Sequence, residues 1–68
     1  MASESRFADV RRLLERAGYS LARIHGSHHN FVKRGARGIS VPVHQGKVKP
    51  VYVRQVKKLI AEGSEGSA

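Results

Sequence analysis

The sequence has no cysteine, no tryptophan and no apolar run that approaches the ~20 residues needed to span a bilayer. Without cysteine there are no disulfide bridges and no thiolate metal sites, which agrees with a reducing compartment. The N-terminus lacks an apolar signal core, so we expect a cytoplasmic protein that is neither secreted nor bound to a membrane. A chain of 68 residues has room for one small domain, which buries only about 60% of the surface of its unfolded state.

Acidic side chains are also scarce. Five Asp and Glu stand against 13 Lys and Arg, which gives a formal net charge of +8 at pH 7. No acid occurs between residues 16 and 61, whereas basic residues extend from Arg6 to Lys58. Basic side chains often serve solubility alone. An acid-free stretch of this length instead favours a nucleic-acid partner, whose phosphates the positive charge neutralises. A membrane surface fits less well, since neither expected helix has an aromatic-rich apolar face.

The spacing of apolar residues predicts a helix at each end of the chain. The first helix is expected to follow a cap at Ser3 or Ser5 and to end at Gly18. The second is expected to begin at Pro50 and to end at Gly63. Their apolar positions recur at helical spacing: Phe7, Val10, Leu13, Leu14 and Ala17 in the first, and Val53, Val56, Leu59 and Ile60 in the second.

Three strands are expected between the helices, over residues 19–24, 28–33 and 39–43. Breaks at residues 26–27 and at the glycine-bounded segment 35–38 make them consecutive antiparallel neighbours. The fold class is therefore α+β, with a three-stranded antiparallel sheet and two helices on one face, which leaves the other face in solvent. The domain is expected to cover residues 5–62, with a flexible tail over residues 63–68.

Residues 26–31, with the sequence GSHHNF, place two imidazoles after a small, flexible pair. Successive side chains of a strand point to opposite faces. If Phe31 faces the core, so does His29, whereas His28 and Asn30 lie on the open face. His28 is then the exposed histidine beside Gly26 and Ser27, where a ligand can approach. Three interpretations remain open: ordinary surface and core histidines, a zinc site, or acid–base chemistry on a polyanion.

The zinc interpretation requires a set formed by His25, His28, His29 and His44. It is the weakest of the three, because no cysteine and no nearby carboxylate supports the metal. We therefore expect no metal and no cofactor. In the catalytic interpretation, an RNA 2′-hydroxyl is the nucleophile and His28 moves its proton, with His29, Ser27 and Gly26 in supporting positions. The candidate phosphate-binding residues are Lys33, Arg37, Lys47 and Lys49.

Several segments together resemble one known family. They are LLERAGY at 13–19, Arg23, GSHHNF at 26–31, VPVH at 41–44, VKP at 48–50, VR at 53–54 and VK at 56–57. In this order and spacing they are similar to the HicA-type toxins of bacterial HicA/HicB toxin–antitoxin modules. The resemblance extends over residues 6–61. It departs from the family at Val51 and Tyr52, where a small residue and Thr are usual, and in the short glycine-rich hairpin that carries Arg34 and Arg37.

This resemblance implies a double-stranded-RNA-binding-like fold with the order α-β-β-β-α. It implies the toxin of a type II module, an mRNA interferase that needs no metal and has one essential histidine. That role transfers to His28, and a one-residue shift in register would transfer it to His29. The partners implied are mRNA and a HicB-type antitoxin that covers the active site. The alternative is a non-catalytic RNA-binding module of the same fold, and a decayed toxin that only binds its protein partner is a third reading.

Overall fold

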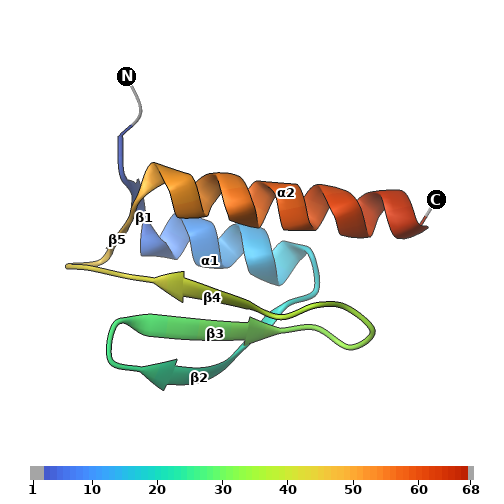
Figure 1. Ribbon diagram of the computed structural model, residues 1–68, viewed down its shortest axis with the longest axis horizontal. Helices are drawn as coiled ribbons and strands as arrows, with labels where there is room; N and C mark the ends of the chain where they lie inside the picture. The colour runs from blue at the N-terminus through green and yellow to red at the C-terminus, as the bar shows by residue number, and fades with distance from the viewer. Residues whose placement is uncertain (1–2, 68) are drawn as a thin grey trace.

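The computed structural model describes residues 3–67, and the side chains up to Glu62. Its elements in chain order are β1 (Ser5–Arg6), α1 (Phe7–Arg16), β2 (Ser20–His25), β3 (His28–Val32), β4 (Ile39–Pro42), β5 (Lys47–Val48) and α2 (Pro50–Ser67). Strands β2, β3 and β4 form an antiparallel sheet in that order, and β1 pairs with β5 in a second, small ladder (Figure 1). The predicted α+β fold, with a three-stranded antiparallel sheet and two helices, is confirmed.

Both helices lie on the same side of the sheet (Figure 1). The core explains this arrangement, because buried residues of one sheet face pack with buried residues of both helices. The core residues are Val10 and Leu14 from α1, Tyr19, Phe31 from β3, Val41 from β4, Val48 from β5, and Val56 and Leu59 from α2. Burial of these apolar side chains is the main stabilising contribution to a domain of this size. The opposite face of the sheet is not covered by either helix (Figure 1).

The start of α1 differs from the sequence prediction. Neither expected serine caps the helix; Arg6 is the N-cap residue, and it makes no side-chain cap hydrogen bond. Ser5 is instead part of β1, where it pairs with Val48. The backbone N–H of Phe7 donates to the carbonyl of Gly46 at 2.8 Å. A long-range backbone contact thus satisfies a helix N–H group that a local cap would otherwise serve.

The predicted stop at Gly18 is confirmed. Gly18 has φ +96°, a conformation that suits glycine. The N–H of Tyr19 donates to the carbonyl of Leu14 at 2.9 Å, and the N–H of Gly18 to that of Glu15 at 3.0 Å. This pair of bonds is a Schellman motif, and its apolar contact joins two core residues, Tyr19 and Leu14.

Other boundaries shift by small amounts. Strand β2 begins at Ser20, after Tyr19, whose buried ring joins the core and whose hydroxyl donates to the backbone carbonyl of Arg37 at 3.0 Å. Strands β3 and β4 each end one residue early. A bulge between Leu21 and Arg23 explains the mixed alternation of this segment. Leu13, placed in the apolar stripe of α1, is 36% exposed.

Helix α2 continues to Ser67, beyond the end predicted at Gly63. The side chains of residues 63–67 and all of Ala68 lie outside the described part, so the flexibility of residues 63–68 stays a prediction. Within residues 3–67, neither helix is both long enough and apolar enough to cross a bilayer.

Candidate functional site

A two-residue turn, Gly26 and Ser27, joins β2 to β3. Gly26 has φ +56°, and a positive φ at the first turn residue is typical of a type II′ hairpin turn. The carbonyl oxygen of Ser27 accepts two hydrogen bonds, from the N–H of Val43 at 2.7 Å and from Nδ1 of His29 at 3.2 Å. The tip of the hairpin is therefore fixed to the chain just beyond β4. These contacts also fix the position of His28 and His29, which directly follow the turn.

His28, the first residue of β3, is exposed on the sheet face that the helices leave open. It lies opposite His25 of β2 on one side and opposite Pro42 of β4 on the other. Its Nδ1 is 3.5 Å from Oγ of Ser40, which is a long hydrogen-bonding distance. This contact leaves the outer ring nitrogen, Nε2, available to a ligand. The outward position expected for His28 agrees with the structure.

His29 points the other way and is half-buried. Its ring centroid is 4.6 Å from that of Phe7, with the ring planes at 54°. Because the carbonyl of Ser27 can only accept, Nδ1 of His29 carries the proton in this contact. Opposite His29 stand Ile24 and Val41, both aliphatic. The ring of His29 thus packs against the edge of the core, and its surroundings are those of a structural residue.

A polar row lies next to His28 on the same open face. Arg23, Asn30 and Ser40 stand opposite one another on β2, β3 and β4. Arg23 and Ser40 are exposed and Asn30 is half-buried. The sequence analysis placed Asn30 on this face and did not name Arg23 or Ser40. Counting outward from the two-residue turn pairs Arg23 with Asn30, because the bulge in β2 lies beyond Arg23, between it and Leu21.

The four candidate phosphate-binding residues fall into two groups. Lys47 and Lys49 follow the loop that continues from the end of β4 beside His28, at the same end of the sheet (Figure 1). Lys33 and Arg37 follow the far end of β3. Lys33 is five positions along the chain from His28 and just beyond the end of β3, which is roughly 17 Å at the usual rise of a strand. The structure therefore brings only one of the two groups to the end of the sheet that carries His28.

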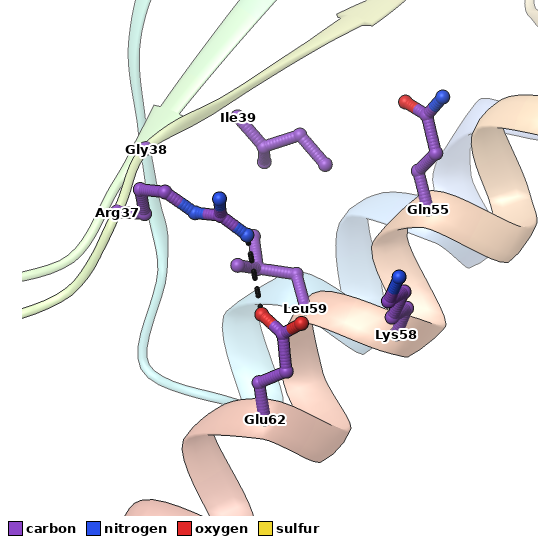
Figure 2. A pocket seen from close by; sticks show the side chains of 7 residues that line it. All are labelled: Arg37, Gly38, Ile39, Gln55, Lys58, Leu59 and Glu62. Carbon is purple, nitrogen blue, oxygen red and sulfur yellow. Dashed lines mark hydrogen bonds and ion pairs between the residues drawn. The ribbon is translucent and has the colours of Figure 1, made fainter.

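The distant pair also has other contacts. Nζ of Lys33 lies 5.7 Å from the centre of the Tyr19 ring. The guanidinium of Arg37 donates to Oε1 of Glu62 at 3.1 Å, and both side chains are largely exposed. Figure 2 shows this ion pair among the side chains that line a hollow between the start of β4 and α2, which Gln55 and Lys58 also line. The hollow measures about 450 Å³ and lies at the end of the sheet away from His28.

The zinc interpretation is not supported by the placement of the histidines. His25 and His28 share the open face, whereas His29 points to the opposite face. Among residues 3–67, no group of three or more His, Cys, Asp or Glu side chains is placed to hold a metal ion. What the open face offers is an exposed imidazole pair, a neighbouring hydroxyl and a guanidinium, with lysines at the same end. This set suits proton transfer beside a phosphate.

Comparison with known proteins adds one result. A family model described as the HicA toxin of bacterial toxin–antitoxin systems matches residues 7–61, well over half of the chain. The matched segment contains α1, the three-stranded sheet, β5 and most of α2, and with them the hairpin that carries both central histidines. No curated protein matches the chain.

Proposed function

The chain belongs to the HicA toxin family of bacterial toxin–antitoxin systems, and on this premise we propose that it is a metal-independent endoribonuclease that cleaves mRNA with His28 as its acid–base residue. The observation that carries the proposal is the position of His28. It is exposed, it stands on the sheet face opposite the helices, and the turn before it is fixed to the end of β4. An imidazole held in this way meets the first geometric requirement of a general base, which is access to the proton that it removes.

The proposed reaction uses a nucleophile that the RNA itself supplies. The 2′-oxygen attacks the adjacent phosphorus while His28 accepts the proton of the 2′-hydroxyl. A bond forms between O2′ and phosphorus, and the bond between phosphorus and O5′ breaks. The products are a 2′,3′-cyclic phosphate and a 5′-hydroxyl. General acid–base catalysis by one residue typically contributes about 10²- to 10⁴-fold to such a rate.

The neighbours of His28 support this role. The contact of Nδ1 with Oγ of Ser40 leaves Nε2 as the ring nitrogen that is open to the RNA. Arg23, on the same face, and Lys47 and Lys49, at the same end of the sheet, are the proposed contacts to the phosphates, where they offset the negative charge of the reacting group. Lys33 and Arg37 lie too far from His28 for this task, so we assign them to flanking RNA.

Three remaining residues of the hairpin have supporting roles in this proposal. Gly26 provides the positive φ of the turn, and Ser27 fixes the turn through its carbonyl. His29 orients the start of β3 by packing on Phe7. The partner proposed is a HicB-type antitoxin that covers the open sheet face in the cytoplasm, and membership in a toxin–antitoxin family supports it.

The test compares wild type, His28→Ala and His44→Ala on RNA in the presence of EDTA. His44 is the matched control, an exposed histidine in the loop after β4. We expect wild type and His44→Ala to cleave RNA to 2′,3′-cyclic phosphate ends, and His28→Ala to lose about 10²- to 10⁴-fold of the rate. Equal cleavage by His28→Ala would overturn the assignment, as would products with 5′-phosphate ends. RNA binding by wild type without any cleavage would support the non-catalytic module instead.

A second readout follows growth. Induced expression of wild type should arrest growth and degrade total RNA, while His28→Ala should do neither. Co-expression of the antitoxin should relieve the arrest. Growth arrest by His28→Ala at an equal protein level would contradict the proposed chemistry.

A further inference from the structure

The turn of the β2–β3 hairpin places a second imidazole next to His28. His25 is the last residue of β2 and His28 the first of β3, and the two are directly opposite each other. Opposite residues of antiparallel strands project to the same face, with Cβ atoms about 4.5–5.5 Å apart. Both side chains are exposed. The open face therefore carries a pair of adjacent imidazoles at its edge.

Cleavage of RNA by its own 2′-hydroxyl requires two proton transfers. O2′ must lose a proton as it attacks, and O5′ must gain one as it leaves. In an in-line displacement these two oxygens lie on opposite sides of phosphorus. A single imidazole reaches one of them at a time, whereas two imidazoles side by side can serve both in the same step.

We propose that His25 is a second catalytic residue, which donates a proton to the departing O5′ while His28 accepts the proton of the 2′-hydroxyl. The proposal rests on the proposed function of His28. As the O2′–phosphorus bond forms and the phosphorus–O5′ bond breaks, the proton count is balanced, because His28 gains one proton and His25 loses one. Exchange of both imidazoles with water restores the starting state.

His28 keeps the role of base from the proposed function, which leaves the departing O5′ to His25. Oγ of Ser40 lies 3.5 Å from Nδ1 of His28, so Nε2 is the nitrogen of this ring that is open to the RNA. The other cross-strand neighbour of His28, Pro42, has no side-chain group that can transfer a proton, so His25 is the titratable residue directly opposite His28. Space is open at the turn as well: apart from its chain neighbours His25 and Ser27, no described residue has an atom within 4 Å of a Cβ placed on Gly26.

The experiment uses two short RNA substrates that differ at one atom. One has the ordinary O5′ at the scissile bond, and the other has sulfur in that position. A thiolate leaves without needing a proton, so the sulfur substrate does not require a general acid. The proteins compared are the full-length wild type, His25→Ala, His25→Gln, His28→Ala and the control His44→Ala, each verified as folded by its thermal melt.

On the ordinary substrate we expect His25→Ala and His25→Gln to lose about 10²- to 10⁴-fold of the cleavage rate. On the sulfur substrate both should cleave within a few-fold of wild type, while His28→Ala remains impaired on both substrates. Wild-type cleavage of the ordinary substrate by His25→Ala would overturn the proposal. Equal losses on both substrates would also overturn it, since they indicate a role in RNA binding.

The two proposals can fail separately. Loss of activity in His28→Ala together with full activity in His25→Ala would overturn only the second catalytic residue. Full activity in His28→Ala would overturn the proposed function itself.

Discussion

Replacing His29 by Ala should lower the stability of the domain without removing the proposed chemistry at His28. The variant loses a ring contact with Phe7, worth about 0.5–1.5 kcal/mol for an aromatic pair. It also loses the hydrogen bond to the carbonyl of Ser27, worth about 0.5–1.5 kcal/mol net. We expect a combined loss of about 2 kcal/mol, which lowers Tm by roughly 8–16 °C for a domain of this size.

The expected loss of stability sets the temperature at which the cleavage activity of this variant can be measured. Domains of this length have roughly 3–10 kcal/mol of stability, so His29→Ala stays mostly folded at 15–25 °C, which is about the range for the cleavage assay. Thermal melts followed by circular dichroism compare wild type with His29→Ala and His28→Ala. As a surface substitution, His28→Ala should change stability by less than about 0.5 kcal/mol. Two results would refute the reasoning: destabilisation of His28→Ala to the level of His29→Ala, or a folded His29→Ala that cannot cleave RNA.

Three further outcomes are expected. Phe31→Ala should cost about 3–5 kcal/mol in urea unfolding, because the side chain is fully buried, whereas Val32→Ala, 49% exposed, should cost under about 1 kcal/mol; similar midpoints would contradict the core assignment. Gly26→Ala should lower stability by about 1–2 kcal/mol through its positive φ, and an unchanged melting temperature would contradict the turn geometry. Lys47→Ala should reduce RNA cleavage at low salt and lower the slope of log RNA affinity against log salt concentration by about 0.7–0.9. Lys33→Ala should lose less cleavage, and a larger loss for Lys33→Ala than for Lys47→Ala would contradict the placement of RNA near His28.

Local patterns predicted the elements that depend on local physics. Helical spacing found α1 and α2, and Gly18 marked the end of the first helix because its positive φ is a backbone requirement. Strand alternation separated His28 from His29, since the period of a strand requires no knowledge of the partner strand. The identity of the exposed histidine was therefore available from six consecutive residues.

Other features depend on pairing between distant segments and left no local pattern. The β1–β5 ladder has two residues in each strand, too few to alternate, so Ser5 was assigned to a helix cap. The bulge between Leu21 and Arg23 shifts the register at the start of β2, so the alternation of Leu21 does not continue that of Arg23 and His25. The ion pair between Arg37 and Glu62 joins residues 25 positions apart, and the local sequence around neither residue indicates it.

The β1–β5 ladder also bears on the order in which the chain can assemble during synthesis. Helix α1 and the hairpins of the sheet are complete once residue 42 has left the ribosome, but β1 has no partner until Lys47 and Val48 follow. Contacts of such long sequence separation form late, because the closing loop must be ordered first. Ser5 and Arg6 therefore remain unpaired in the nascent chain until its C-terminal third has been synthesised. An affinity tag at the N-terminus would join the chain a few residues before this late-forming ladder, which makes that end the less suitable place for one.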